Sequence, residues 1–479
     1  MSGARYQSPL STRYASPAMQ ALWGDAHRAA LWRRLWLALM ETEKELGLAI
    51  PDEAVAALRE HLDDANLSAV TQYERRFRHD VMAHIHALGD QAPAARPYLH
   101  LGATSAFVAD NADLLVMRDG LRLLLGRLIA LLRALAGFAE RHASLPCLAY
   151  THFQPAQLTT VGKRAVLWAQ DFLLDAEEIC YRLETVRFRG CKGTTGTQAS
   201  FLELFGGDHA RVRELDRRVT ERMGFARSFA AGGQTYSRKQ DSAILDTLSG
   251  LAQSAAKLAG DLRLLQHEGE LLEPFESEQI GSSAMAYKRN PMRAERISGL
   301  ARFLISLQQN TAQTAASQWL ERTLDDSANR RLVLPQAFLT ADAILILATN
   351  VATGLEVREA VIARHVEEQM PFMATERWLM LGVQAGGDRQ GLHEVIRTES
   401  LRAAEEVSAG KPNVLLERMA AHPAFRSVPA TALAAELEPA RYTGRSEAQV
   451  GEFLRETLAP ALERAGRLAA AAESAEVSV

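Results

Sequence analysis

The segment from Gly281 to Arg296 carries side chains that could hold an anion and remove a proton. It reads Gly-Ser-Ser-Ala-Met-Ala-Tyr-Lys-Arg-Asn-Pro-Met-Arg-Ala-Glu-Arg. Its small residues are typical of a mobile loop, because glycine leaves φ unrestricted, and Pro291 can open a helix after it. Ser282 could act as a base near Lys288, since a neighbouring cation stabilises an alkoxide. For an isolated Ser–Lys pair, a solvated basic loop is the simpler interpretation.

An imidazole occurs in the polar segment Tyr-Thr-His-Phe-Gln-Pro, which begins at Tyr150 and precedes a predicted helix. Histidine is the side chain best suited to exchange a proton near neutral pH. Taken alone, His152 is more simply explained as a structural residue, because isolated polar side chains usually satisfy local hydrogen bonds.

A third polar cluster runs from Arg322 to Arg331 and reads Arg-Thr-Leu-Asp-Asp-Ser-Ala-Asn-Arg-Arg. The paired aspartates could suggest a divalent metal, but the flanking arginines suggest that the carboxylates orient guanidinium groups. Arginine binds phosphate through two parallel hydrogen bonds, and Ser327 can add a hydroxyl. The alternative is a solvated run of charges.

Three histidines follow each other closely at positions 79, 84 and 86. Their spacing does not favour a metal site, because His84 and His86 do not share a helix face and His79 is five residues from His84. The segment from Gly193 to Gln198 lacks the Gly-Lys-Ser/Thr ending of a nucleotide triphosphate loop. These spacings favour neither a metal site nor a nucleotide triphosphate loop.

The elements that position these residues are predicted to be helices. Apolar residues repeat with steps of three and four along two stretches, from Val161 to Ile179 and from Ile244 to Leu265, and few windows alternate with period two. We expect an all-α protein with an N-terminal helical domain at 1–104, a central long-helix bundle at 105–357 that carries the loop 281–291, and a C-terminal helical domain at 358–479. Long seams of this kind commonly pack between subunits. The tail from Ala469 is expected to fray.

Composition excludes several classes of protein. The 479 residues are 47% hydrophobic and 23% charged with a net charge of −4, which is typical of a soluble protein of two or three domains and not of a nucleic-acid or membrane-surface binder. Three cysteines without Cys-x-x-Cys spacing indicate buried thiols in a reducing compartment.

Targeting and membrane segments are not expected either. The segment from Met1 to Leu10 has no apolar signal core. The apolar stretch 121–138 contains three arginines, and the run 332–347, interrupted by Pro335 and Asp342, reads as a buried helix. We expect a cytoplasmic protein.

The segment at 281–296 resembles the signature loop of the fumarase/aspartase superfamily, Gly-Ser-Ser-x-Met-Pro-x-Lys-x-Asn-Pro. Its Tyr-Lys-Arg-Asn-Pro-Met-Arg portion is similar to the adenylosuccinate lyase family. Ala286 stands where the pattern usually has proline, which frees φ, restores an N–H and predicts a more mobile loop. The resemblance extends from Arg13 to the Thr-Gly-Arg segment that ends at Arg445.

The resemblance implies a three-domain all-α fold and a β-elimination in purine biosynthesis. Fumarate would be released from adenylosuccinate to give AMP and from SAICAR to give AICAR. The family's solution is a homotetramer whose active sites each draw on three subunits. No cofactor, nucleic acid or membrane is implied.

The same resemblance assigns roles to single residues. Ser282 would be the general base and His152 the general acid, with His79 supporting the acid or a substrate oxygen. The succinyl carboxylates would be held by Lys288, Asn290, Thr104 and Ser105. The nucleotide phosphate would be held by Arg13, Tyr14, Arg322, Ser327 and Arg331. Further substrate contacts would come from Arg78, Asp80, Thr151, Gln234, Ser283 and Arg296.

Two alternative functions compete with this one. Another lyase of the superfamily would act on argininosuccinate, aspartate or malate, and the cluster from Arg322 to Arg331 argues against the last two because they carry no phosphate. A non-catalytic paralogue kept for its structure is the second alternative. The presence of Ser282, Lys288, His152 and His79 argues against it.

Overall fold

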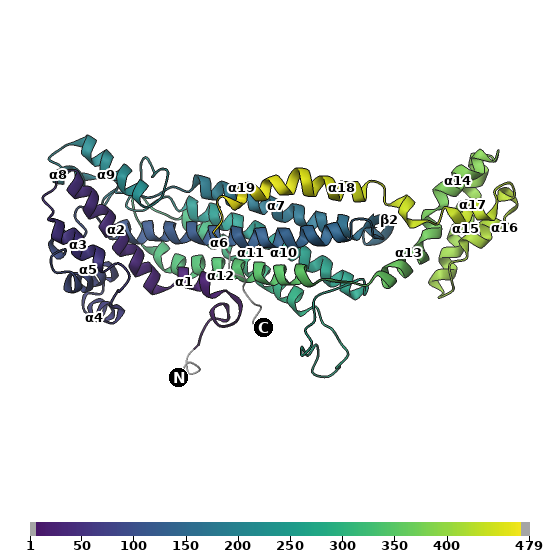
Figure 1. Cartoon of the computed structure of the whole chain (residues 1–479), viewed down its shortest axis with the longest axis horizontal. Helices are drawn as coiled ribbons and strands as arrows, with labels where there is room; N and C mark the ends of the chain where they lie inside the picture. The colour runs from purple at the N-terminus through teal and green to yellow at the C-terminus, as the bar shows by residue number, and fades with distance from the viewer. Residues whose placement is uncertain (1–5, 471–479) are drawn as a thin grey trace.

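Long helices running side by side form the centre of the molecule (Figure 1). The computed structural model describes residues 6–470. Within them the central bundle comprises α6 (Ser105–Arg141), α7 (Val161–Thr185), α10 (Lys239–His267), α11 (Met292–Ala316) and α12 (Asp325–Gly354). The all-α prediction is confirmed, since the described strands form only two small two-stranded sheets.

The two predicted seams lie on α7 and α10, and the apolar residues that repeat in steps of three and four, from Val161 to Ile179 and from Ile244 to Leu265, are buried. Helix α12 is long and apolar enough to cross a membrane by length and composition, but 78% of its most apolar window is buried inside the protein. The prediction of a buried helix at 332–347 is therefore confirmed. Pro335 lies inside α12 without ending it, and Asp342 is buried in an ion pair with Arg127 of α6.

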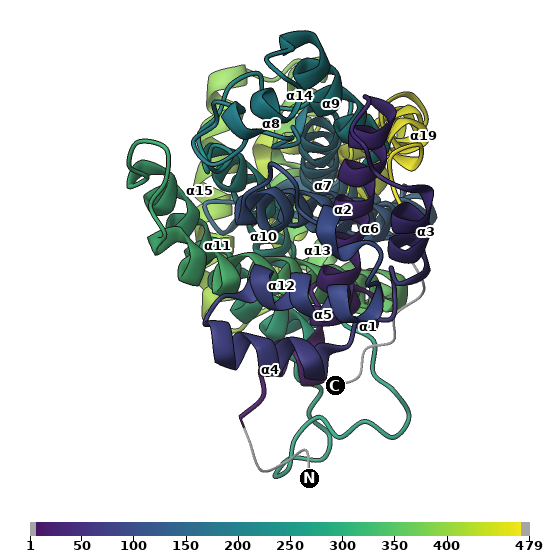
Figure 2. The same ribbon diagram turned by 90° about the vertical axis from the view of Figure 1, so that its left-hand side faces the viewer.

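The N-terminal helices cover one end of the bundle (Figure 1, purple). They are η2 (Leu10–Tyr14), α1 (Pro17–Leu22), α2 (Asp25–Glu45), α3 (Asp52–Glu60), α4 (Leu67–Phe77), α5 (Asp80–Gln91) and η3 (Arg96–Tyr98). Figure 2 looks along the bundle from this end. Of the segment predicted to lack a signal core, residues 1–5 lie outside the described residues.

A β-hairpin follows α6 and corrects the prediction of a loop immediately before a helix. Strand β1 (Pro146–Thr151) pairs antiparallel with β2 (Gln154–Thr160), and α7 begins directly after β2. His152 and Phe153 form the turn with φ of 51° and 58°, a backbone conformation that residues with a Cβ seldom adopt. Between α7 and α10 lie α8 (Ala199–Leu204) and α9 (His209–Arg222), and β3 (Leu271–Leu272) pairs with β4 (Glu356–Val357).

The C-terminal region has a second apolar core, around Trp378, Leu415 and Phe425. Its helices are α13 (Glu359–Met373), α14 (Thr375–Gln384), α15 (Arg389–Ser408), α16 (Leu415–Ala421), η4 (Pro423–Phe425), α17 (Ala430–Ala435), η5 (Pro439–Tyr442), α18 (Ser446–Glu452), η6 (Phe453–Leu458) and α19 (Ala459–Gly466). The last of these return along the central bundle, where Val450 and Leu458 join the main core (Figure 1, yellow). Of the tail predicted to fray, residues 471–479 lie outside the described residues.

Candidate active site

The first group of predicted site residues lies where the N-terminal helices meet α6 and α12. His79 caps α5, with its Nδ1 accepting from the Met82 N–H at 3.3 Å and its Nε2 at 3.4 Å from Ser105 Oγ. Thr104 occupies the N-cap position of α6, and Arg78, in the left-handed conformation with φ of 55°, ends α4.

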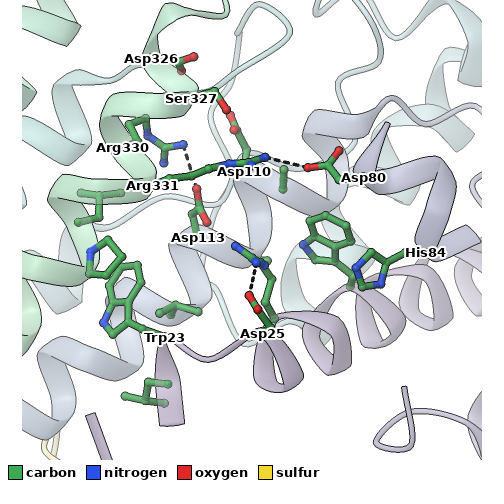
Figure 3. Close-up of a pocket in the computed structure, with 18 of the residues that line it drawn as sticks. Trp23, Asp25, Asp80, His84, Asp110, Asp113, Asp326, Ser327, Arg330 and Arg331 are labelled. Carbon is green, nitrogen blue, oxygen red and sulfur yellow. Dashed lines mark hydrogen bonds and ion pairs between the residues drawn. The ribbon is translucent and has the colours of Figure 1, made fainter. Parts of the chain in front are cut away.

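An ion pair joins this group to α12. Arg331 donates to Asp80 Oδ2 at 2.8 Å, across 251 positions of sequence (Figure 3). The structure therefore brings residues near positions 79, 105 and 331 to one end of the bundle.

The start of α12 carries a carboxylate that orients two arginines. Asp326 Oδ2 accepts from Arg322 Nη1 at 3.2 Å and from Arg238 Nε at 2.7 Å. Arg238 also binds both oxygens of Asp110 at 3.1 Å. Asp326 and Arg330 are buried, so a solvated run of charges does not describe this segment.

Arg330 lies inside the protein and contacts residues far from it in sequence. Its guanidinium donates to Asp241 Oδ2 at 2.7 Å and to the Tyr236 hydroxyl at 2.5 Å, and it lies 2.9 Å from Asp113. Burial alone would raise the pKa of Asp110, but the neighbouring Arg238 and Arg330 guanidinium groups hold it below its ordinary value. Burial raises the pKa of Asp113 despite Arg330.

A cavity of about 350 Å³ opens beside this network. Its lining includes Arg322, Ser327 and Arg331, the residues predicted to hold a phosphate. Trp23 and His84 also line it and lie below Ser327 and Arg331 in Figure 3. Burial lowers the pKa of His84 to about 4, which leaves the imidazole neutral at pH 7.

The three clustered histidines have separate surroundings. The His84 ring packs against Trp32 with the ring centroids 4.7 Å apart, and the His86 ring packs against Phe77 at the same separation. His79 faces Ser105. Each imidazole therefore has its own packing or capping contacts.

Gln234 is held beside the loop that carries Arg322. Its backbone N–H donates to the Glu321 carbonyl at 3.0 Å, and its side-chain Nε2 donates to the Thr194 carbonyl at 3.0 Å. The buried Arg189 donates to the Gln234 carbonyl at 2.7 Å. Gln234 thus belongs to the same end of the bundle as Arg322.

A second group forms further along the bundle. Helix η2 carries Arg13 and Tyr14 and packs against α12. The Arg296 guanidinium of α11 lies 5.7 Å from the centre of the Tyr14 ring.

The third group is the loop before α11, which projects from the bundle (Figures 1 and 2). Ser282 Oγ accepts from the Met285 N–H at 3.1 Å, and Asn290 donates to the Gly281 carbonyl at 2.8 Å. Ser283 and Lys288 are exposed. Arg289 ties the loop to β4 through an ion pair of 2.6 Å with Glu356.

The fourth group is the hairpin turn with Thr151 and His152, both exposed. Phe153 beside them is 65% exposed. Burial raises the pKa of Tyr150, at the base of the turn, to about 12. The hairpin therefore presents an imidazole to solvent beyond the far end of α6.

These groups lie far apart within one chain. Helix α6 has 37 residues, so about 54 Å separates Ser105 from the end of the helix that leads to the hairpin. Along α12, about 35 Å separates Arg331 from Gly354, near the point where Glu356 anchors the loop of Ser282. One chain does not bring His79, His152 and Ser282 together.

The sequence did not predict the buried network that supports the first group. Its members are Asp110, Asp113, Tyr236, Arg238 and Asp241. The available signal was a pair of aspartates three residues apart in a stretch of α6 that is apolar apart from these and Asn111, because buried carboxylates are rare unless paired.

Comparison with known proteins agrees with this architecture. The model of a lyase family matches residues 30–305, and that of the adenylosuccinate lyase C-terminus matches residues 371–453. Adenylosuccinate lyase from Saccharomyces cerevisiae is 48% identical over 96% of both chains, and that from Schizosaccharomyces pombe is 46% identical over 95% of both.

Solved structures share the fold at lower identity. The 3-carboxy-cis,cis-muconate lactonizing enzyme from Pseudomonas putida has a TM-score of 0.80 at 23% identity and covers 96% of this chain and 99% of its own. A fumarate lyase from Mesorhizobium sp. BNC1 has a TM-score of 0.78 at 23% identity, covering 94% and 100%.

The helical bundle, the exposed Gly-Ser-Ser loop and the lyase match define a lyase of the fumarase/aspartase superfamily. The two adenylosuccinate lyases above are 48% and 46% identical to this chain over 96% and 95% of its length. The chain belongs to the adenylosuccinate lyase family.

Proposed function

We propose that this chain cleaves adenylosuccinate to AMP and fumarate, and SAICAR to AICAR and fumarate, with Ser282 as base and His152 as acid. The observation that carries the reaction is the identity of 48% with an adenylosuccinate lyase over 96% of both chains. Its support at the site is that Arg322, Ser327 and Arg331, side chains suited to a phosphate monoester, line one cavity, where Asp326 and Asp80 hold the two guanidinium groups.

The chemistry of a β-elimination explains the side chains needed. A base removes a weakly acidic proton next to a carboxylate, and the resulting carbanion places extra charge on that carboxylate. Fixed cations and hydrogen-bond donors stabilise this charge, which is the role we assign to Lys288, Asn290, Thr104 and Ser105. The carboxylate is itself the electron sink, so the reaction requires no metal or organic cofactor.

The departing nitrogen must then receive a proton. The exposed imidazole of His152 is suited to this step because histidine exchanges protons near neutral pH. His79 would support the acid or a substrate oxygen. Arg78, Asp80, Thr151, Gln234, Ser283 and Arg296 would add substrate contacts, and Arg13 and Tyr14 would join the phosphate site.

Two observations support a homotetramer with shared sites. The separation of about 54 Å along α6 prevents one chain from joining His79 and His152 in one site. Leu167, Leu174 and Tyr181 are 45%, 57% and 52% exposed and recur every seven residues on one face of α7. Such an apolar stripe favours packing against another long helix, and a second copy of the chain supplies one. We place this assembly in the cytoplasm.

The first experiment is adenylosuccinate cleavage by the purified protein, followed by ultraviolet absorbance with fumarate measured separately. We expect activity in the parent and a loss of kcat of about 10²–10⁴-fold in Ser282→Ala, as general base removal predicts. The matched control is Ser306→Ala on α11, whose hydroxyl donates only to the Phe303 carbonyl among the described residues.

If the parent protein does not cleave adenylosuccinate, the proposed function is wrong and one of the two alternatives replaces it. A folded tetramer that cleaves argininosuccinate instead would be another lyase of the superfamily. A folded tetramer inactive on both substrates would be a structural paralogue.

A further inference from the structure

Three loops cross in direct backbone contact beside the first group of site residues. They are the segments 190–198, 232–236 and 319–322, which we call the loop junction. A Cβ on Gly196 would lie 1.7 Å from the Gly232 carbonyl oxygen, and one on Gly233 would lie 2.6 Å from the Glu321 carbonyl oxygen. These contacts admit only glycine, so the three loops are locked against one another.

A single buried guanidinium holds the junction from inside. Arg189 is 1% exposed and donates from Nε to the Gln234 carbonyl at 2.7 Å, from Nη1 to that of Gly190 at 2.9 Å and from Nη2 to that of Gly193 at 3.0 Å. One side chain therefore fixes the start of the segment 190–198 and the carbonyl of Gln234.

Helix α6 anchors this arginine. Asn111 is fully buried, and its Oδ1 accepts from the N–H groups of Arg189 at 3.0 Å and Gly190 at 3.1 Å. The preceding residue, Asp110, accepts from the Tyr236 N–H at 3.1 Å. Two neighbouring residues of α6 thus hold both sides of the junction, about two turns from Thr104 and Ser105 on the same helix.

The buried positive charge of Arg189 distinguishes it from a residue that only fills space. Burying a guanidinium is costly unless every donor is satisfied, and the side-chain hydrogen bonds of Arg189 go to peptide carbonyls, without an ion pair among the described residues. The charge is thus used to fix backbone geometry. The fixed backbone includes Gln234, whose own N–H binds Glu321 next to Arg322.

We propose that Arg189 is a positioning residue for the elimination: it sets Gln234 relative to Arg322 without touching the substrate. The inference rests on the proposed function, because Gln234 is the residue through which Arg189 acts. A small displacement of a substrate-binding group is enough to reduce turnover greatly.

A double-mutant cycle tests the coupling. Arg189→Lys keeps the buried charge but cannot reach all three carbonyls, and Gln234→Met removes the amide at nearly constant size. We expect each to lower kcat/KM about 10- to 100-fold. The double variant should match Gln234→Met alone within about twofold, because Arg189 then has nothing left to position.

The control is a second arginine that binds carbonyls but not Gln234. Arg118 is 12% exposed at its side chain and donates to the Met223 and Gly224 carbonyls at 3.0 and 3.1 Å. Arg118→Lys should lower Tm. Its kcat/KM should equal that of the parent when it is alone, and that of Gln234→Met when the two are combined.

Two outcomes would overturn the inference. Fully multiplicative effects of Arg189→Lys and Gln234→Met would reduce Arg189 to a structural role. If Gln234→Met leaves kcat/KM unchanged, Gln234 does not contribute to turnover and Arg189 cannot act through it. If the parent cleaves no adenylosuccinate, the proposed function fails separately. Hydrogen exchange then tests separately whether Arg189 holds the loop junction. This requires faster exchange at 193–198 and 233–236 in Arg189→Lys but not in Arg118→Lys.

Discussion

Mixing two inactive variants tests whether one active site is built from several chains. Ser282→Ala lacks the proposed base and His152→Ala lacks the proposed acid. Each homotetramer should keep at most about 1% of the parent activity, as removal of a general acid or base predicts. If different subunits supply the two residues, a mixed tetramer contains some sites with both native side chains.

The structure sets the expected yield. The length of α6 places about 54 Å between Ser105 and the helix end that leads to the hairpin of His152, so sites that unite the groups must cross subunits. With equal amounts and random assembly, about half of the sites receive a native Ser282, and about half of those also receive a native His152. Re-equilibrated mixtures should regain about a quarter of the parent activity.

The assay is adenylosuccinate cleavage after the two variants, carrying different affinity tags, have been re-equilibrated and mixed tetramers isolated by both tags. Mixing Ser282→Ala with Lys288→Ala is the matched control. Both residues lie on one loop, so no mixed site is complete and no activity should return. Absence of any recovery in verified mixed tetramers of Ser282→Ala and His152→Ala would refute shared sites.

Three further predictions address stability and loop closure. Gly196→Ala should destabilise the fold by about 3 kcal/mol in chemical denaturation, since φ is +84° and the new Cβ would meet a carbonyl oxygen. The control Gly206→Ala, at a φ of +60° with open space around it, should cost only about 1 kcal/mol. Equal costs for the two substitutions would contradict the close contact at the loop junction. Burial raises the pKa of Glu43 from 4.5 to about 9, so the folded state keeps a proton that the unfolded chain loses, and stability falls as pH rises through this window. Glu43→Gln should therefore make Tm depend less on pH between pH 5 and 9. An unchanged slope of Tm against pH would argue against a buried neutral acid. Hydrogen exchange at 281–290 should slow at saturating substrate in Ser282→Ala, as for a lid that excludes water, and unchanged exchange would count against closure.

The central helices could be predicted because their apolar periodicity is strong. Both seams, on α7 and α10, fall on buried faces as expected. The hairpin of β1 and β2 escaped prediction because its turn is made by His152 and Phe153 at positive φ, where Gly or Asn would have signalled a tight turn. Neither strand shows a regular alternation of buried and exposed residues.

The sequence indicates which side chains the candidate site contains, but it does not indicate which residues they pair with in the folded protein. The ion pair of Asp80 with Arg331 joins residues 251 positions apart, and no local pattern predicts a contact of that range. Arg330 is next to Arg331 in sequence, yet it turns inward to Asp113 and Asp241. A helix directs consecutive side chains to different faces, so Arg330 pairs with buried carboxylates while the adjacent Arg331 pairs with Asp80 of α5.

The replacement of the usual proline by Ala286 leads to a last prediction. The Lys288 N–H donates to the Met285 carbonyl at 3.0 Å, which makes Ala286 the second residue of a four-residue turn. Proline is favoured at that position because its fixed φ matches the turn. Among the described residues the Ala286 N–H makes no backbone hydrogen bond, so proline would remove no bond there.

Ala286→Pro should therefore be tolerated and should restrict the unfolded and open states of the loop, adding about 0.4–1 kcal/mol of local stability. We expect slower hydrogen exchange at 281–290 without substrate and full catalytic activity. Ala284→Pro is the control, because the Ala284 N–H donates to Ser282 Oγ at 3.4 Å and its loss should disturb the proposed base. A loop that exchanges faster in Ala286→Pro, or equal damage from both substitutions, would mean that the turn at 285–288 is not the conformation the loop adopts before closure.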